Sequence, residues 1–408
     1  MLKGTNLEYA KIYNERIVLE TIRLNGPLSR AQVARRTELT PQTISNITAQ
    51  LMERNLVVET GRKQGGRGSP STQLEFSADG AFAVGLDLDQ DHLTGVLVNL
   101  NGVVQGRFYQ KLDFPEPAEA LTLIASVAEQ LIAEQGLEPS QVWGVGVGLP
   151  GPIRISGGRA LDQIVNPHSF PGWENVPVVD ELTKRLKLPV FLENNATAAA
   201  IGETFYGAGQ GVSNFVYVFL GVGLGGGIVL NGQPFHGFQG NTGEFGFIPV
   251  RRADGKIDRV GSYFNLPSLY QELGRAGYTA ATPSDLEPLF LTQNDVLLSW
   301  LECAAEQLAP ALVAGELFVD PESIVFGGSW PAPLIDYLIE QLTALLPELR
   351  IAQKAYQPQL IHAEAGEDAA ALGVAILPIY DSLAPHLKLL EKNSRSPPNQ
   401  SPALAGRR

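Results

Sequence analysis

The stretch VYVFLGVGLGGGIVLNGQPF, residues 216–235, alternates apolar segments with glycine-rich turns. This pattern predicts a strand, a glycine turn, a second strand and a tight Asn-Gly turn. The stretch AVGLDLDQDHLTGVLVNLNGVV, residues 83–104, predicts a similar pair of strands nearer the N-terminus. From Phe82 onward such strands alternate with helical patterns, which is typical of an α/β protein. The repeated β-rich start therefore predicts a duplicated domain with a cleft between two lobes.

Length and composition limit the class of protein. The chain has 408 residues, of which 44% are hydrophobic and 18% are charged, as in a globular protein of two or three domains. The first residues, MLKGTNLEYAKIYNER, lack the apolar segment of a signal peptide. No apolar run reaches the roughly 20 residues that a membrane helix needs. Cys303 is the single cysteine, which excludes an intramolecular disulfide and a cysteine-based zinc cluster. We expect a cytoplasmic protein that does not contact a membrane.

The charge is distributed unevenly along the chain. The net charge is −13, yet residues 1–74 hold 11 basic and 6 acidic side chains, whereas the rest holds 19 and 37. A basic head on an acidic body predicts that only the head meets a polyanion. Chance variation in the charge of a small domain gives the same imbalance, so the head needs a second argument.

Three helical patterns in residues 8–58 supply that argument. The first runs from Tyr9 to Leu24 and ends before a Gly-Pro pair. Its apolar positions are Ile12, Ile17, Val18, Ile22 and Leu24. The second begins at Ser29, which can form a capping box with Gln32. The third begins at Thr40, an N-cap followed by proline. Joined by a turn around Glu38-Leu39, the last two predict a helix-turn-helix.

The third helix has an apolar face and a polar face. Ile44, Ile47 and Leu51 fall on one stripe and should pack inward. The opposite face carries short amide and hydroxyl groups suited to base edges in a major groove. A solvated helix face is the alternative interpretation of these polar residues. The candidate DNA-contacting residues of this helix are Gln42, Thr43, Ser45 and Asn46.

A wing follows the third helix. The stretch LVVETGRKQGGRGSPSTQLEF, residues 56–76, predicts strand, glycine-rich turn and strand. Arg62, Lys63 and Arg67 lie in or beside that turn, where they can contact a phosphate backbone or enter a minor groove. We therefore predict a winged helix-turn-helix DNA-binding domain, with its wing and linker, at residues 1–80. Its expected partner is a double-stranded DNA operator.

Six further stretches give the chain a resemblance to the ROK family of bacterial sugar kinases and sugar-responsive repressors. They are VGVGLPGPI (145–153), PGWENVPVVDEL (171–182), LENNATAAAIGE (192–203), GVGLGGGIVLNGQPFHGFQGNTGEFGF (221–247), PESIVFGGSW (321–330) and GEDAAALGVA (366–375). The winged helix-turn-helix resembles that of the repressor branch. The resemblance implies that residues 81–389 form a two-lobed, actin-like (ribonuclease H-like) sugar-kinase fold. It also implies a homodimer or homotetramer.

The phosphate-binding and catalytic features of the kinases are incomplete here. The family's first phosphate turn, Asp-x-Gly-Gly-Thr, corresponds to residues 87–91, which read DLDQD. The second turn keeps five glycines in residues 221–227. The family's catalytic Asp corresponds to Asn195. An amide cannot accept the proton of the sugar hydroxyl, and general-base catalysis of this kind is worth about 10²–10⁴ in rate. We predict no enzyme activity, no catalytic residue and no cofactor. The alternative is an active sugar kinase with a fused DNA-binding head, in which Asp89 or Asp91 recruits a metal.

The resemblance also implies a sugar site. Asn194 and Glu244 match two of the family's sugar contacts, while Phe247 replaces a histidine and Pro267 a second glutamate. We predict that Asn194, Asn195, Glu244 and Phe247 surround a sugar or related metabolite. A pocket filled by its own side chains is the alternative. The family's zinc site would fall at Phe247, Asp258, Val260 and Asn265, which lack thiolates and histidine, so we predict no metal.

These inferences combine into one functional prediction. We expect a transcriptional regulator, a repressor of carbohydrate-utilisation genes, whose degenerate kinase-like body senses a sugar and changes the spacing of two DNA-binding heads. A body that senses a protein partner instead is a third possibility. Residues 390–408 are polar and rich in proline and serine, which is typical of a disordered tail.

Overall fold

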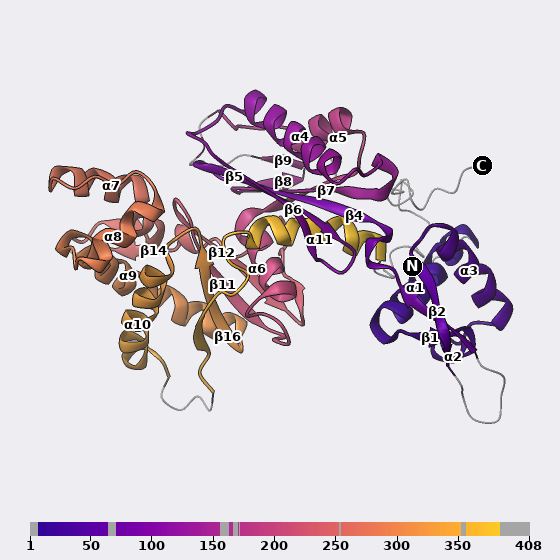
Figure 1. The fold of residues 1–408 in the computed structure, drawn as a ribbon. Helices are drawn as coiled ribbons and strands as arrows, with labels where there is room; N and C mark the ends of the chain where they lie inside the picture. Colours follow the sequence, from indigo (N-terminus) through magenta and orange to yellow (C-terminus); the bar gives the residue numbers. More distant parts are fainter. Residues whose placement is uncertain are drawn as a thin grey trace.

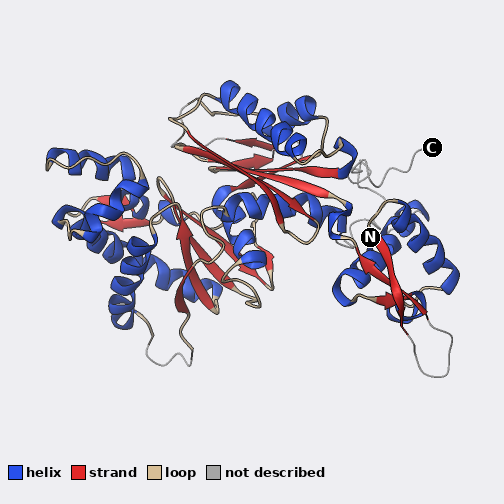
Figure 2. Cartoon of the chain, viewed as in Figure 1, coloured by secondary structure: helices blue, strands red, loops and turns tan. Residues whose placement is uncertain are grey.

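The computed structural model describes residues 7–63, 71–155, 163–165, 170, 172–252, 254–351 and 356–383. A small N-terminal head is joined to a larger body of two sheets (Figures 1 and 2). The predicted fold class is confirmed: the head is a winged helix-turn-helix and the body has the two-lobed α/β architecture. The predicted tail, residues 390–408, lies outside the described residues.

The head contains three helices and a three-stranded sheet. The helices are α1 (Leu7–Asn25), α2 (Arg30–Thr37) and α3 (Pro41–Glu53). The sheet has the order β1-β3-β2, with β1 at Leu28–Ser29, β3 at Ser71–Phe76 and β2 at Val57–Lys63. The antiparallel pair β2 and β3 forms the wing.

Local sequence signals explain where the head helices begin. Ser29 caps α2 and exchanges hydrogen bonds with Gln32, which is the predicted capping box. Thr40 accepts the N–H of Thr43 at the start of α3. Glu38 ends α2 with a φ of 58°, a left-handed conformation that turns the chain toward α3. Among the apolar positions of the first helix, Ile22 is buried, whereas Leu24 is 64% exposed. Residues two apart lie on opposite sides of a helix.

The first lobe of the body is a five-stranded sheet covered on both faces. The sheet has the order β10-β7-β4-β5-β6. Its strands are β4 (Phe82–Leu88), β5 (His92–Asn99), β6 (Val104–Lys111), β7 (Val142–Leu149) and β10 (Val190–Asn194). Helices α4 (Pro117–Glu134) and α5 (Val178–Leu186) cover one face, and α11 (Ala369–Leu383) covers the other (Figure 1). The hairpin of β8 (Ile153–Ile155) and β9 (Gln163–Val165) follows β7.

The second lobe repeats the arrangement around a sheet of order β13-β12-β11-β16-β17. Its strands are β11 (Phe215–Leu220), β12 (Leu224–Leu230), β13 (Gln233–Pro234), β16 (Ser323–Gly328) and β17 (Gln359–His362). One face packs against α7 (Leu266–Arg275), α8 (Leu286–Leu291), α9 (Asp295–Val319) and α10 (Ala332–Leu349). A small hairpin pairs β14 (Pro249–Arg251) with β15 (Ile257–Arg259). Helix α9 is long and apolar enough to cross a membrane by length and composition, but its buried leucines and alanines belong to the core of this lobe.

Two central helices connect the lobes. Helix α6 (Asn195–Tyr206) packs on β11 and β12 of the second lobe and also on α11, which covers the first sheet. The two helices touch backbone to backbone: a Cβ added at Gly373 would lie 1.8 Å from the Ala198 carbonyl oxygen, and one added at Gly202 would lie 2.1 Å from that of Ala369. Only glycine fits at such contacts, so α6 and α11 are closely interlocked.

The head shares a core with the body. Val18, Leu19 and Ile22 of α1 are buried in one apolar cluster with Ile376 and Ile379 of α11. The Arg16 guanidinium also donates to the backbone carbonyl of Asp381. Strand β3 ends at Phe76 and β4 begins at Phe82, and we propose the division between head (1–80) and body (81–389) on this basis.

Candidate functional site

Helix α3 presents its polar face outward. Gln42, Ser45 and Asn46 are exposed, while Ile44 and Ile47 are buried on the opposite side. Within the described part of the head, the exposed side chains bond inside the helix: Gln42 Nε2 donates to Asn46 Oδ1 at 3.1 Å, and Ser45 Oγ donates to the carbonyl of Pro41 at 2.9 Å. Such local bonds are readily exchanged for bonds to a base edge.

The remaining predicted DNA contacts are placed differently. Thr43 is half-buried, and its hydroxyl lies 2.8 Å from that of Thr40 at the helix start, so it shares in the cap. Arg62 and Lys63 occupy the end of β2, where their side chains are not described. Arg67 lies outside the described residues.

Basic residues of α2 were missed by sequence reasoning. Arg35 and Arg36 are exposed in its last turn, next to the turn that leads into α3. Arg30 instead bridges the parts of the head, since its Nε donates to Thr48 Oγ1 at 3.2 Å and its Nη2 to Glu59 Oε1 at 2.9 Å. The basic residues along α2 would have indicated Arg35 and Arg36 from the sequence, but the role of Arg30 is visible only in the tertiary structure.

A cavity of about 140 Å³ lies in the cleft between the lobes. Strand β10 ends and α6 begins on one side of it, and the glycine turn between β11 and β12 lies on the other. All four predicted ligand-binding residues line this cavity: Asn194, Asn195, Glu244 and Phe247. Pro267 lies in the first turn of α7 and is not among the lining residues.

Asn194 has two functions in the local structure. It is the N-cap of α6, and its Oδ1 accepts the backbone N–H groups of Ala196 at 2.9 Å and Thr197 at 3.2 Å. Its Nδ2 therefore remains to face the cavity. A Cβ added at Gly151 would lie 2.6 Å from Asn194 Nδ2 and 3.3 Å from Glu244 Oε1. An amide donor and a carboxylate acceptor thus converge on one point, an arrangement suited to a sugar hydroxyl.

The other lining residues complete a partly polar pocket. Burial raises the pKa of the Glu244 carboxyl, because desolvation disfavours its charge. Asn195 is buried, with its Oδ1 accepting the N–H of Ala196 at 2.9 Å. The Phe247 ring is 42% exposed and lies 5.0 Å from the Arg259 guanidinium. Phe247 therefore forms one edge of the pocket and leaves its mouth open.

A buried carboxylate lies beside the glycine turn between β11 and β12. Asp89 is buried, and a Cβ added at Gly221 would lie 3.2 Å from its Oδ2. Burial raises the pKa of Asp87 to about 7 and also raises the pKa of Asp89. An acidic group facing the glycine turn opposes a triphosphate by desolvation cost and by repulsion when ionised. In the described part of the chain, no group of three or more His, Cys, Asp or Glu side chains is placed to hold a metal ion.

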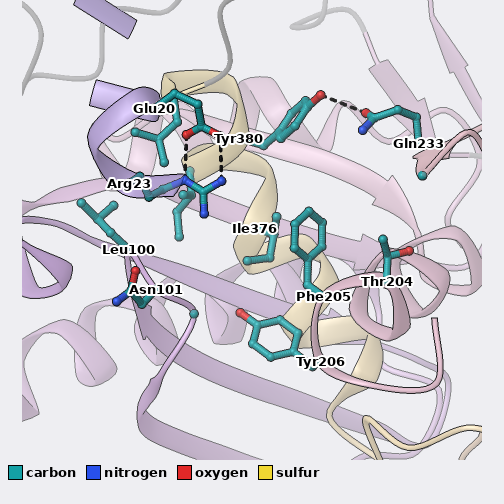
Figure 3. A pocket seen from close by; sticks show the side chains of 14 residues that line it. Glu20, Arg23, Leu100, Asn101, Thr204, Phe205, Tyr206, Gln233, Ile376 and Tyr380 are labelled. Atoms are coloured by element: carbon teal, nitrogen blue, oxygen red, sulfur yellow. Dashed lines mark hydrogen bonds and ion pairs between the residues drawn. The ribbon is translucent and has the colours of Figure 1, made fainter. Parts of the chain in front are cut away.

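A larger cavity, of about 420 Å³, lies where the head meets the body. Figure 3 shows Arg23 of α1 at the left, Ile376 of α11 in the middle and Thr204 of α6 toward the right. The two charged residues that line it form an ion pair, with Arg23 Nη2 2.7 Å from Glu20 Oε1 (Figure 3). Two neutral lining residues are also bonded to each other, since Tyr380 Oη donates to Gln233 Oε1 at 2.9 Å. The cleft cavity is smaller, but it holds the convergent donor and acceptor and is the better candidate site.

Comparison with known proteins agrees with both parts of the structure. The model of the ROK family matches residues 83–380, and that of the MarR family matches residues 13–68. A xylose repressor of Caldicellulosiruptor bescii is 25% identical over 393 residues, covering 92% of this chain and 97% of that protein. The Bacillus subtilis xylose repressor is 28% identical over 242 residues, covering 59% of this chain and 62% of that protein, less than two thirds of its length.

Two further comparisons concern the kinases and the fold. A glucokinase of Halalkalibacterium halodurans is 30% identical over 272 residues, covering 62% of this chain and 81% of the enzyme. The crystal structure of a ROK family transcriptional regulator, a homologue of the Escherichia coli MLC protein, superimposes with a TM-score of 0.72. It covers 94% of this chain and 99% of that chain at 23% identity, and so supports the fold.

Proposed function

The chain belongs to the ROK family, and we propose that it is a DNA-binding transcriptional repressor whose kinase-like body senses a sugar. The observation that carries this proposal is the exposed polar face of α3 in a winged helix-turn-helix fused to a ROK body. A relative that matches over 97% of its own length is named a xylose repressor.

The geometry of the head supports operator binding. Helix α3 enters the major groove, where Gln42 and Asn46 can bond adenine edges and Ser45 can bond either base. Arg62, Lys63 and Arg67 of the wing contact the phosphate backbone or the minor groove, and Thr43 supports the start of the helix. A two-fold dimer would place two such heads on the half-sites of one operator.

The body provides a site for one sugar ring. A cavity of about 140 Å³ is smaller than the roughly 300–1,000 Å³ of sites for drug-sized ligands. Asn194 donates to a hydroxyl, Glu244 accepts from one, Asn195 shapes the floor, and the Phe247 ring lies against an apolar sugar face. Xylose is the first sugar to test, because two relatives of this chain are named xylose repressors.

We propose that the body does not phosphorylate the sugar. Asn195 stands where the family's base is expected, and Asp89 faces the glycine turn. The glucokinase relative keeps the alternative of a kinase with a fused head open to experiment. An ATP-dependent turnover of any hexose or pentose in a coupled ADP assay would replace this part of the proposal.

The deciding experiment measures DNA binding with and without sugar. DNA fragments enriched by the protein in vitro are labelled, and anisotropy gives their affinity in the presence of xylose, other pentoses, hexoses and amino sugars. We expect specific binding that one sugar weakens. A thermal-shift screen runs in parallel, because a ligand at 100 times its Kd adds about 2.7 kcal/mol of stability. Absence of specific DNA binding would overturn the proposal, and a body indifferent to every sugar would favour a protein signal.

A further inference from the structure

Resting on the proposed sugar-sensing function, we propose that Glu193 and His236 form a positioning pair that bridges the two lobes and sets the affinity of the sugar pocket. The two side chains are 43 residues apart in sequence, and His236 Nε2 lies 2.7 Å from Glu193 Oε2. Glu193 is in β10 of the first lobe, and His236 follows β13 of the second.

Glu193 connects this pair directly to the pocket. Its second carboxylate oxygen, Oε1, accepts the backbone N–H of Asn194 at 2.9 Å. Asn194 in turn caps α6 and directs its Nδ2 into the cavity. One carboxylate therefore uses one oxygen to hold a pocket residue and the other to hold the opposite lobe.

His236 lies at the start of the loop that carries Glu244. This loop, residues 235–243, is attached to the second lobe through the N–H of Phe235, which donates to the Ile228 carbonyl at 2.7 Å. Among the described residues, two contacts attach it to the first lobe: that of His236 with Glu193, and that of Asn241 Oδ1, which accepts the N–H of Ile153 at 3.1 Å. Releasing the His236 contact would leave one of these two cross-lobe attachments, and Glu244 would lose part of its alignment with Asn194.

The surroundings allow the pair to respond to protonation. The Glu193 side chain is 10% exposed and that of His236 is 45% exposed, so water reaches the imidazole but hardly the carboxylate. Both border a cavity of about 180 Å³ whose other lining residues are Ile153, Leu192, Gly237, Phe238, Gln239 and Gly240. Among these described lining residues, Glu193 and His236 are the titratable groups. The hydrogen bond to Glu193 raises the pKa of His236.

The sign of the pH effect follows. Protonated His236 pairs with the Glu193 carboxylate, and because its pKa is raised in the folded state, this contribution is present at low pH and is lost as pH rises through the raised pKa. Sugar affinity should therefore fall as pH rises from about 6.5, the ordinary pKa of histidine, through this raised pKa. A bond to a charged group is strong enough for its loss to weaken binding by about tenfold.

The test compares His236→Gln, His236→Ala and Glu193→Gln with the wild type and with Phe238→Ala. Phe238 is fully exposed on the same loop and serves as the matched control. Calorimetry gives the Kd for xylose, or for the sugar found in the screen, across this pH range. We expect His236→Gln to bind without the wild-type pH dependence, His236→Ala to bind about tenfold more weakly at about pH 6, and Phe238→Ala to match the wild type.

A second readout needs no sugar. Hydrogen exchange measured by mass spectrometry should show faster exchange in residues 235–247 of His236→Ala and Glu193→Gln than in Phe238→Ala. Unchanged exchange, or the same sugar affinity and pH profile in the His236 variants as in the wild type, would overturn the positioning pair. If no sugar binds any form while exchange accelerates as expected, the sugar-sensing function fails and the bridge between the lobes stands.

Discussion

The two roles of Asn194 can be separated by two substitutions. Asn194→Ala removes both the cap and the amide donor. Asn194→Asp keeps an oxygen that can accept the N–H groups of Ala196 and Thr197 but replaces Nδ2 with an acceptor. The new oxygen would stand near Glu244 Oε1, because both groups approach the same point above Gly151 at 2.6 and 3.3 Å.

The expected magnitudes follow from these contacts. Asn194→Ala should destabilise the protein by about 1 kcal/mol, the usual loss for a helix N-cap, whereas Asn194→Asp should unfold at the same or higher urea concentration. Both should lose sugar affinity. Asn194→Asp should lose more than about tenfold, because a hydrogen bond worth about 0.5–1.5 kcal/mol disappears and two carboxylates are brought together.

Urea denaturation and calorimetry with the sugar found in the screen give the two quantities. The reasoning is refuted if Asn194→Asp binds the sugar as tightly as the wild type, since its donor would then play no part. It is equally refuted if Asn194→Ala is as stable as the wild type, because the cap would then be replaceable by water.

Three further predictions concern the head, Asn195 and Asp87. Gln42→Ala and Asn46→Ala should each cost about 1–3 kcal/mol of binding to selected DNA while leaving non-specific binding unchanged, as measured by anisotropy; equal losses on both DNAs would contradict base contact. Asn195→Asp should gain no ATP-dependent phosphorylation of any sugar in a coupled ADP assay, because Asp89 still faces Gly221. Measurable turnover would show that a carboxylate at position 195 is sufficient for phosphorylation and that Asp89 does not prevent it. The folded-state pKa of Asp87 is raised to about 7, so the folded protein holds a proton that the unfolded chain releases at lower pH, and stability should fall as pH rises from about 4 to 7. Asp87→Asn should flatten that part of the plot of urea midpoint against pH. An unchanged plot would assign the pH dependence to other groups.

Local features of the head could be predicted because short segments determine them. The capping box of Ser29 and Gln32 and the buried face of Ile44 and Ile47 both depend on residues within two helical turns. Leu24 is exposed because its spacing of two residues from the buried Ile22 does not fit one face of a helix.

The candidate site could be predicted in part. The resemblance to a family supplied Asn194 and Glu244, which the structure places on one cavity. The contact of His236 with Glu193 and the approach of Asp89 to Gly221 were not predictable, because they join distant segments with no periodic pattern between them.

The joint between α1 and α11 has a consequence for engineering. Since Val18, Leu19 and Ile22 are buried in one apolar cluster with Ile376 and Ile379, a head transplanted from another repressor would meet a foreign surface. Chimeras that exchange only the DNA-binding head should aggregate or lose their response to sugar. Chimeras that also exchange the matching face of α11 should keep their solubility and their response. The unit of modular exchange in this protein is therefore discontinuous, comprising the N-terminal segment and one side of a helix near the C-terminus.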